Sequence, residues 1–172
     1  MSVQYLASPM GVLRLWAREG KLRQIEPVPA AEQDFPDAVT EQAASELQEY
    51  FAGKRTEFTV AALPCGSAFQ QRVWSALSRV PYGRVVTYGA LAAAIGQPTA
   101  CRAVASAVGK NPLLILIPCH RVVAAAGLGG FSAGLEAKRT LLALEGVQIE
   151  EKTPFSEKFV GLSMMCYTFG KE

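Results

Sequence analysis

The spacing of apolar residues changes once along this chain, at the segment Leu63-Pro64-Cys65-Gly66. Before this segment apolar and polar residues alternate, for example in residues 3–7, and turn-forming residues separate the alternating runs. Alternation puts successive side chains on opposite faces of a strand, so it predicts a small antiparallel sheet. After the segment apolar residues recur at helical spacing, for example in residues 73–80. The chain is therefore expected to be an α+β protein, with a sheet in its first third and a mainly helical remainder.

The N-terminal part is expected to contain three strands and one helix. The strands are predicted at residues 3–7, 12–16 and 22–25, and residues 56–60 are a candidate for one more. A helix is predicted over residues 37–51, because its apolar residues recur at helical spacing and Gly53 follows as a stop signal. Together these elements form a first predicted domain, residues 1–64.

The remainder of the chain is expected to consist of short helices with recognisable ends. Ser67 and Gln70 predict a capping box, and Thr87 is a predicted cap for a helix over residues 88–95. A short turn joins that helix to an alanine-rich helix over residues 100–109, which is typical of a helix-turn-helix, although tight helix packing would explain the small residues equally well. The last predicted elements are a strand over residues 113–117 and a helix over residues 135–145. A second domain is therefore predicted at residues 65–150, followed by a C-terminal extension, residues 151–172.

Composition restricts the class of protein to which the chain can belong. Half of its 172 residues are hydrophobic and 19% are charged, which excludes disordered and collagen-like chains. No apolar run reaches the roughly 20 residues that span a bilayer, and no secretory signal pattern opens the chain. An intracellular protein without a membrane partner is therefore expected, cytoplasmic in a prokaryote or nuclear in a eukaryote. The 4 cysteines are widely spaced and there is 1 histidine, so reduced thiols and no bound metal are expected.

The near-neutral total charge of +2 hides an uneven distribution of charged residues. Residues 1–65 contain 6 basic and 9 acidic side chains, and residues 140–172 contain 3 and 5. Residues 66–139, in contrast, contain 8 basic side chains and 1 acidic side chain. The middle of the chain is therefore a basic block between two acidic flanks.

Cys119 is the strongest candidate for a reactive residue. It follows the most hydrophobic run of the chain and lies between Pro118 and His120. A cysteine among apolar side chains is ordinarily an inert, protonated thiol. His120 and Arg121 follow directly, however, and a nearby imidazole or guanidinium favours the thiolate, which is the nucleophile. From the residues alone both a structural cysteine and a nucleophile that reaches His120 through water stay open.

A histidine that acts as a base needs a partner that holds its tautomer. The two carboxylates nearest in the sequence are Glu136 and Glu145. Glu145 follows the end of a predicted helix, where the helix dipole disfavours a negative charge. Its position therefore favours a role other than that of a solvated surface charge.

The segment Pro118-Cys119-His120-Arg121-Val122, preceded by Asn111-Pro112, resembles the active-site signature of the O6-alkylguanine-DNA alkyltransferases, also called methylated-DNA–protein-cysteine methyltransferases. Further motifs occur in the order and spacing of that family from Phe69 to Gly146. They are Phe69-Gln70, Val73-Trp74, Pro81-Tyr82-Gly83, Thr87-Tyr88, Leu91-Ala92, Arg102-Ala103-Val104, Phe131-Ser132, Gly134, Lys138, Leu141-Leu142 and Glu145-Gly146. Zinc-binding N-terminal cysteine and histidine residues of some relatives have no counterpart before Cys65.

This resemblance implies catalytic roles for five residues. Cys119 would attack the alkyl carbon on guanine O6 and keep the group as a thioether, so each molecule would act once. His120 would take the thiol proton through water, and Glu145 would orient the imidazole. Tyr88 would donate a proton or a hydrogen bond to guanine N3. Asn111 would hold the turn that precedes the active-site segment. The implied reaction needs no cofactor.

The resemblance also implies a pocket for the alkylated base. Phe131 and Pro112 would line it, Ser132 would contribute near O6, and the backbone carbonyl of Val122 would bind the guanine amino group. The implied substrate is O6-alkylguanine in double-stranded DNA, with O4-alkylthymine as a second candidate.

A DNA-binding surface is the last implied feature. The DNA-binding residues would be Thr99, Arg102, Ala103 and Arg121, although Arg121 could instead be structural. The alanine-rich helix would enter the minor groove, and Arg102 would take the place of a nucleotide flipped out of the duplex. Phosphate contacts from the basic block would make binding dependent on salt and largely independent of sequence.

Two other functions compete with alkyl transfer. A non-catalytic sensor of alkylated DNA is the main alternative, but such proteins lack the cysteine at the position of Cys119. A cysteine hydrolase or thiol redox enzyme would use Cys119 and His120, but it would leave Arg102 and the basic block unexplained. The resemblance therefore favours a monomeric DNA repair enzyme that acts by suicide transfer.

Overall fold

The computed structural model describes residues 1–148 and divides into two compact units. The first unit contains Met1–Cys65 together with Pro112–Leu116, and the second contains Gly66–Asn111 together with the chain from Ile117 onward. The short segment 112–116 thus groups with the first unit, although it lies within the range predicted for the second domain. The predicted extension, residues 151–172, and the last two residues of the predicted second domain lie outside the described residues.

A three-stranded antiparallel sheet with the order β1-β2-β3 forms the first unit. Its strands are β1 (Ser2–Ser8), β2 (Gly11–Arg18) and β3 (Lys21–Val28). The register of β1 with β2 runs from Ser2 opposite Ala17 to Ser8 opposite Gly11. The three predicted strands are confirmed, and in β2 the buried residues Leu13, Leu15 and Ala17 alternate with less buried neighbours, as the pleat of a strand requires.

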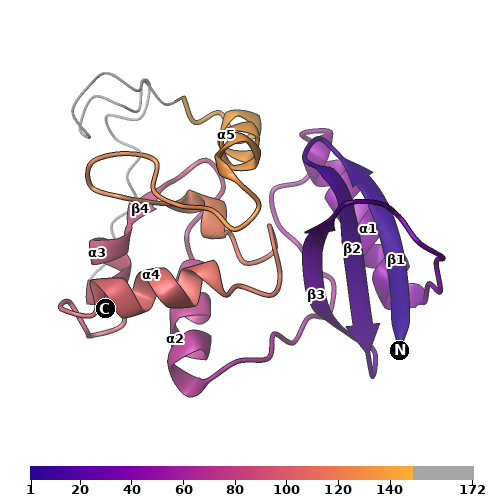
Figure 1. Ribbon diagram of the computed structural model, residues 1–172, viewed down its shortest axis with the longest axis horizontal. Helices are drawn as coiled ribbons and strands as arrows, with labels where there is room; N and C mark the ends of the chain where they lie inside the picture. The colour runs from indigo at the N-terminus through magenta and orange to yellow at the C-terminus, as the bar shows by residue number, and fades with distance from the viewer. Residues whose placement is uncertain (149–172) are drawn as a thin grey trace. The chain divides into compact units, whose positions relative to one another are not determined.

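Helix α1 (Ala38–Phe51) packs against this sheet (Figure 1). Asp37 caps its start by accepting hydrogen bonds from amides of the first turn, one of them the amide of Thr40 at 2.9 Å. Leu47 and Tyr50 of the helix are completely buried, as are several leucines of the sheet. The first unit therefore has an apolar core of its own, built from one face of the sheet and one face of the helix.

The candidate strand at residues 56–60 does not form. The buried carboxylate of Glu46 accepts hydrogen bonds from the backbone amides of Thr59 and Val60, at 2.9 and 3.2 Å. Those amides are therefore unavailable for strand pairing. A single parallel bridge between Leu22 and Ala62 takes the place of a fourth strand.

Residues 112–116 add to β3 by a short parallel pairing. The amide of Ile25 donates to the carbonyl of Pro112 at 2.8 Å, and Ile25 forms a parallel bridge with Leu113. The pairing ends at Ile115, whose φ of 73° lies in the left-handed region that β-branched residues avoid. The strand predicted over residues 113–117 is therefore reduced to isolated bridges, because the backbone turns at Ile115.

The second unit is mainly helical. Its elements are α2 (Ala68–Leu77), β4 (Val86–Thr87), α3 (Tyr88–Ala94), α4 (Cys101–Gly109), the 3-10 helix η1 (Cys119–Arg121), β5 (Val122–Val123) and α5 (Leu135–Leu144). The two short strands pair in parallel, with Val86 opposite Val122. This pairing fixes the start of α3 next to the segment that follows η1.

The predicted helix ends of this unit are confirmed. Ser67 and Gln70 form a reciprocal capping box at α2, and the Thr87 hydroxyl accepts a hydrogen bond from the third residue of α3. Helices α3 and α4 pack on each other, as expected for a helix-turn-helix, and α2 packs on both. The indole of Trp74 donates to the carbonyl of Ala107 at 2.9 Å, which attaches α4 to α2. Within residues 1–148, no helix has the length and apolar character needed to cross a membrane.

Candidate active site

The thiol of Cys119 is buried at the first residue of η1. Cys119 is 3% exposed, and the side-chain amide of Asn111 donates a hydrogen bond to the sulfur at 3.1 Å. The same amide nitrogen also donates to the carbonyl of Ile117 at 2.7 Å. Asn111 therefore bonds to the backbone before Cys119 and contacts the sulfur directly.

Burial raises the pKa of the Cys119 thiol to about 11, although several contacts act in the opposite direction. The hydrogen bond from Asn111, the charge of Lys138 and nearby backbone amides all favour the thiolate. At neutral pH the group is therefore a thiol surrounded by donors that stabilise the anion. Such a thiol needs a base at the moment of attack.

His120, the next residue of η1, is completely buried and lies beside Glu145. Its Nε2 is 2.6 Å from Oε1 of Glu145. Burial lowers the pKa of His120, and this effect outweighs the hydrogen bond to Glu145, which raises it. A neutral imidazole that donates from Nε2 to a carboxylate carries its lone pair on Nδ1. His120 is thus held in the tautomer that can accept a proton at Nδ1.

The carboxylate of Glu145 receives hydrogen bonds at both oxygens. Arg121 donates to it twice, from Nε to Oε2 and from Nη2 to Oε1, each at 2.9 Å. The amide of Gly83 donates to Oε2 at 3.1 Å, from a backbone whose φ of 72° favours glycine. Burial alone would raise the pKa of Glu145, but the bonds from His120 and Arg121 hold it well below its usual range. Glu145 is therefore an ionised partner of His120, whereas Glu136 is exposed and pairs with Arg139.

Arg121 does not lie where a DNA-binding residue is expected, which corrects the prediction from the sequence. The residue is 6% exposed, and in addition to its two bonds to Glu145 its Nη1 donates to the carbonyl of Val80 at 2.6 Å. Its guanidinium also lies over the ring of Tyr82, 5.8 Å from the centroid. A phosphate could be bound only if these buried bonds were broken, so Arg121 is a structural partner of Glu145.

Tyr88 lies at the start of α3, close to a glycine-rich loop, residues 127–134, that precedes α5. Burial raises the pKa of its hydroxyl, and the oxygen accepts a hydrogen bond from the backbone of Gly130. Gly129 has a φ of 74°, and a Cβ atom there would lie 3.2 Å from the Tyr88 hydroxyl oxygen. The loop therefore needs glycine both for its conformation and for its approach to Tyr88. At neutral pH the hydroxyl keeps its proton and can donate it.

The predicted pocket residues fall in different parts of the structure. Val122 is buried directly after η1, Phe131 is half-buried in the loop before α5, and Ser132 is exposed in the same loop. Pro112 belongs to the first unit, where its carbonyl bonds to Ile25. Cys119, His120, Glu145, Tyr88 and Asn111 are all carried by the second unit.

The residues predicted to bind DNA through the helix-turn-helix lie at the start of α4. Thr99, Arg102 and Ala103 are exposed there, and Val104 and Ala107 are buried on the other side of the helix. The exposed surface of α4 thus consists of small side chains and one guanidinium. This arrangement leaves the helix free to approach a narrow groove.

Lys138 was expected among the basic residues that contact phosphate, and the structure gives it a different place. It belongs to the basic block, but its side chain is fully buried on α5 and its Nζ donates to backbone carbonyls of residues near Cys119. A signal was available, because Lys138 shares a helical face with Leu141, Leu142 and Glu145. Lysines on an apolar face are rarely buried unless their ammonium is bound.

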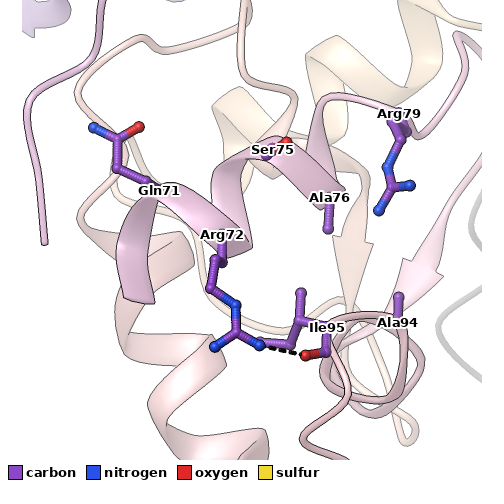
Figure 2. Close-up of a pocket in the computed structure, with 7 residues that line it drawn as sticks. All are labelled: Gln71, Arg72, Ser75, Ala76, Arg79, Ala94 and Ile95. Atoms are coloured by element: carbon purple, nitrogen blue, oxygen red, sulfur yellow. Dashed lines mark hydrogen bonds between the residues drawn. The ribbon is translucent and has the colours of Figure 1, made fainter. Parts of the chain in front are cut away.

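A separate hollow of about 380 Å³ lies between α2 and the end of α3 (Figure 2). Arg72 and Arg79 of α2 line it, and Nη2 of Arg72 donates to the carbonyl of Ile95 at 2.6 Å. None of its lining residues belongs to the group around Cys119. The bond from Arg72 satisfies a carbonyl at the end of α3, so the hollow is explained by helix packing. Within residues 1–148 no group of three or more His, Cys, Asp or Glu side chains could hold a metal ion.

We expect the unfolding free energy of the protein to fall on acidification. The pKa values of both His120 and Glu145 are lowered by folding, so the stability that they contribute is present above their unfolded pKa values and lost below them. For His120 the loss begins near pH 6.5, the usual histidine pKa, and reaches at most about 1.4 kcal/mol per pH unit. Urea unfolding between about pH 7 and pH 5 measures this change. Stability that is constant or rises over this range would contradict the assignment.

Comparison with known proteins assigns both units to the same family. Residues 1–64 match the family model of the 6-O-methylguanine DNA methyltransferase ribonuclease-like domain, and residues 68–147 match that of the DNA binding domain. A methylated-DNA–protein-cysteine methyltransferase of Mycolicibacterium paratuberculosis is 44% identical over 145 residues, which cover 80% of this chain and 88% of the relative. A protein of the same name from Methanosarcina acetivorans is 41% identical and covers 81% of this chain and 94% of the relative.

A solved structure is similar as well. The crystal structure of Mycobacterium tuberculosis OGT in complex with DNA matches with a TM-score of 0.77 and 41% identity. The match covers 84% of this chain and 92% of that chain. The family models, the curated relatives and the solved structure agree on one family. The chain therefore belongs to the methylated-DNA–protein-cysteine methyltransferases, the family of the 6-O-methylguanine DNA methyltransferases.

Proposed function

We propose that this protein repairs O6-alkylated guanine in duplex DNA by transferring the alkyl group irreversibly to Cys119. The observation that carries the proposal is the buried Cys119 thiol, which Asn111 contacts at 3.1 Å and which directly precedes the His120–Glu145 pair. O4-alkylthymine is a second substrate candidate of the same chemistry. The reaction uses only side chains of this chain, so the protein is expected to act as a monomer without a cofactor.

The transfer begins with removal of the thiol proton. The S–H bond breaks, and the proton passes through a water molecule to Nδ1 of His120, whose Nε2 hydrogen stays bound to the Glu145 carboxylate. The Cys119 thiolate then forms a bond to the alkyl carbon as the bond between that carbon and guanine O6 breaks. The electron pair of the broken bond goes to the guanine, and Tyr88 donates a proton or hydrogen bond to N3 to stabilise the departing base.

Recognition of the base would use the residues that follow η1. The Val122 carbonyl would accept from the guanine amino group, Phe131 and Pro112 would stack against the ring, and Ser132 would lie near O6. Because guanine O6 is inside the duplex, the nucleotide has to leave the base stack before transfer, at a cost of a few kcal/mol. Arg102 on the exposed start of α4 would occupy the vacated place in the stack.

The second unit is expected to bind the DNA through its minor groove. Thr99 and Ala103 would contact the DNA backbone beside Arg102, with further contacts from other exposed basic side chains of residues 66–139. The similar M. tuberculosis protein was crystallised in complex with DNA, which supports DNA as the partner. We expect the protein to be located in the compartment that contains the DNA, which is the cytoplasm of a prokaryote or the nucleus of a eukaryote.

A non-catalytic sensor of alkylated DNA is not favoured, because the cysteine is present and His120 and Glu145 lie in contact. Intact-mass measurement tests the proposal directly. After incubation with a duplex that contains O6-methylguanine, the protein should gain one methyl group, and peptide mapping should place it on Cys119. Tight binding to the duplex with an unchanged mass would support the sensor instead, and a modification mapped elsewhere would contradict the assignment of Cys119.

We expect Arg102→Ala to slow repair of duplex DNA while leaving the reaction with free O6-benzylguanine unchanged. Loss of the inserted guanidinium removes part of the energy that offsets base flipping, and a loss of about 1.4 kcal/mol corresponds to tenfold. We therefore expect a decrease of about tenfold or more in the rate of methyl transfer from duplex. Lys54→Ala, which removes a positive charge from the surface of the first unit, is the control. If Arg102→Ala slowed the reactions with duplex DNA and with free O6-benzylguanine equally, Arg102 would act on the transfer step instead.

A further inference from the structure

Leu128 fastens the glycine-rich loop to the core of the second unit. Its half-buried side chain packs against a cluster of buried apolar residues, which are Val85, Val123, Leu142 and Val147. All other residues from 124 to 130 are alanine or glycine, so Leu128 has the only side chain there that is larger than a methyl group. The attachment of this stretch through side chains therefore depends on one residue.

A closed turn precedes Leu128, and another follows Gly130. Each is closed by a backbone hydrogen bond between residues i and i+3, as in a β-turn. These bonds run from the amide of Gly127 to the carbonyl of Ala124 at 3.2 Å and from the amide of Gly134 to the carbonyl of Phe131 at 3.0 Å. The short stretch between the turns therefore has little freedom, and a shift of Leu128 would also shift the two glycines that follow it.

The stretch between the turns lies against the hydroxyl of Tyr88. A Cβ atom on Gly129 would lie 3.1 Å from Cε2 and 3.2 Å from the hydroxyl oxygen of this ring. The backbone amide of Gly130 donates a hydrogen bond to the same oxygen. A tyrosine hydroxyl is both a donor and an acceptor. Because the Gly130 amide uses the oxygen as its acceptor, the hydrogen of the Tyr88 hydroxyl is left to donate to another group.

The bond from Gly130 makes the Tyr88 hydroxyl a better donor. A hydroxyl that accepts one hydrogen bond is polarised and donates a stronger one. As the hydrogen moves toward guanine N3, negative charge builds up on the oxygen, and the amide already points at that oxygen, so no reorganisation is needed. Burial raises the pKa of Tyr88 whereas the bond from Gly130 lowers it, so the amide offsets part of the cost of burying this donor.

We propose that Leu128 is a positioning residue of the alkyl transfer, whose side chain, seated in the apolar cluster, holds the Gly130 amide on the Tyr88 hydroxyl and so directs the hydroxyl hydrogen at guanine N3. The inference rests on the proposed roles of Cys119 and Tyr88. Leu128 adds no step to the reaction: the bond from sulfur to the alkyl carbon still forms as the bond from that carbon to O6 breaks. It acts only through the geometry of the donor.

A merely structural role of Leu128 predicts a different result. If the loop only shaped the pocket, replacing Leu128 would slow the reaction by the same factor with or without the Tyr88 hydroxyl. If Leu128 acts through the hydroxyl, its replacement has no further effect once Tyr88→Phe has removed that group. Two substitutions that act through one group are not additive, and a double-mutant cycle measures this coupling.

The experiment compares the wild type, Leu128→Ala, Tyr88→Phe and the double variant. The rate of Cys119 benzylation by free O6-benzylguanine is followed by mass spectrometry over a range of base concentrations. We expect Leu128→Ala to lower the maximal rate of the wild type about tenfold and to leave the half-saturating concentration unchanged. In the Tyr88→Phe background the same substitution should change the maximal rate less than about twofold. Lys138 keeps its bonds to the carbonyls of residues 128 and 130 in Leu128→Ala, so the loop stays attached to α5.

Leu128→Met is the matched rescue variant, because methionine has a similar volume and keeps the apolar contact. It should keep most of the wild-type maximal rate. Leu63→Ala, which shortens a leucine that is 48% exposed, should leave the rate unchanged. An equal factor for Leu128→Ala in both backgrounds, or an effect below about twofold in the wild-type background, would overturn the inference. If the wild type itself gains no benzyl group on Cys119, the proposed function fails instead.

A second measurement keeps Leu128 in place and therefore does not depend on the folding of Leu128→Ala. Exchange of the Gly130 amide hydrogen with solvent is followed by nuclear magnetic resonance in the wild type and in Tyr88→Phe. Because a bound amide is protected, its exchange should be at least about tenfold faster in Tyr88→Phe. The amide of Gly127, which donates to Ala124, is the internal reference and should exchange equally in both proteins. Equal exchange of the Gly130 amide in the two proteins would overturn the inference.

Discussion

Replacing Cys119 with alanine is expected to abolish alkyl transfer completely. The buried sulfur is the group that Asn111 contacts and that the His120–Glu145 pair follows directly. Without it no thioether can form, so the mass of the protein should stay unchanged after incubation with a duplex that contains O6-methylguanine. Alanine fits the space left by the thiol with the loss of one atom, so the fold should persist.

DNA binding by Cys119→Ala should stay close to that of the wild type, because Thr99, Arg102 and Ala103 at the exposed start of α4 are untouched. Cys65→Ala provides the matched control, since that cysteine is exposed and its loss should not change transfer. Gel-shift titration and intact mass measure binding and transfer on the same samples. Survival of methyl transfer in Cys119→Ala would show that another residue is the acceptor.

Glu145→Gln is expected to have the largest effect on stability. The carboxylate binds Arg121 through two hydrogen bonds of 2.9 Å and His120 through one of 2.6 Å, all of them buried. A neutral glutamine would leave the Arg121 guanidinium as a buried charge without its partner. Removal of one member of a buried ion pair costs about 3 to 5 kcal/mol, and urea unfolding at neutral pH measures this loss.

The same substitution is expected to slow alkylation of the folded protein. His120 would lose the carboxylate that stabilises its imidazolium form after proton transfer, so the rate should fall by up to the factor of about 10² to 10⁴ that a general base contributes. Glu136→Gln is the control, because it removes a carboxylate from α5 whose side chain is 90% exposed. If folded Glu145→Gln reacts with free O6-benzylguanine at the wild-type rate, Glu145 has no part in the proton transfer.

The strands of the first unit could be predicted from the sequence because their side chains alternate with the pleat. The ends of α2 and α3 could be predicted because Ser67, Gln70 and Thr87 satisfy backbone groups only a few residues away. Contacts between distant residues were not accessible in this way. Residues 56–60 have the composition of a strand, yet the carboxylate of Glu46 binds the amides that a strand would need.

The candidate site, like the fold, could be predicted only in part from the sequence. Cys119, His120 and Glu145 could be assigned because their motifs resemble one family in order and spacing, and the structure brings His120 and Glu145 into contact. The position of Arg121 could not be deduced, since the sequence beside a reactive cysteine suits a DNA contact and a buried ion pair equally. The hydrogen bonds that Arg121 donates to Glu145 and to the carbonyl of Val80 show that it belongs to a buried ion pair.

The sequence by itself determined the α+β organisation, the family and the identity of the candidate nucleophile, because these follow from local periodicity and short motifs. Only the tertiary structure decided which members of the basic block face outward. Of its 8 basic residues, Arg121 and Lys138 are buried, one bound to a carboxylate and the other to three carbonyls. Charge counted along a chain carries no information about burial, since the partners that make a buried charge tolerable come from distant segments. The fold therefore divides the basic block between exposed side chains and two buried cations, Arg121 and Lys138.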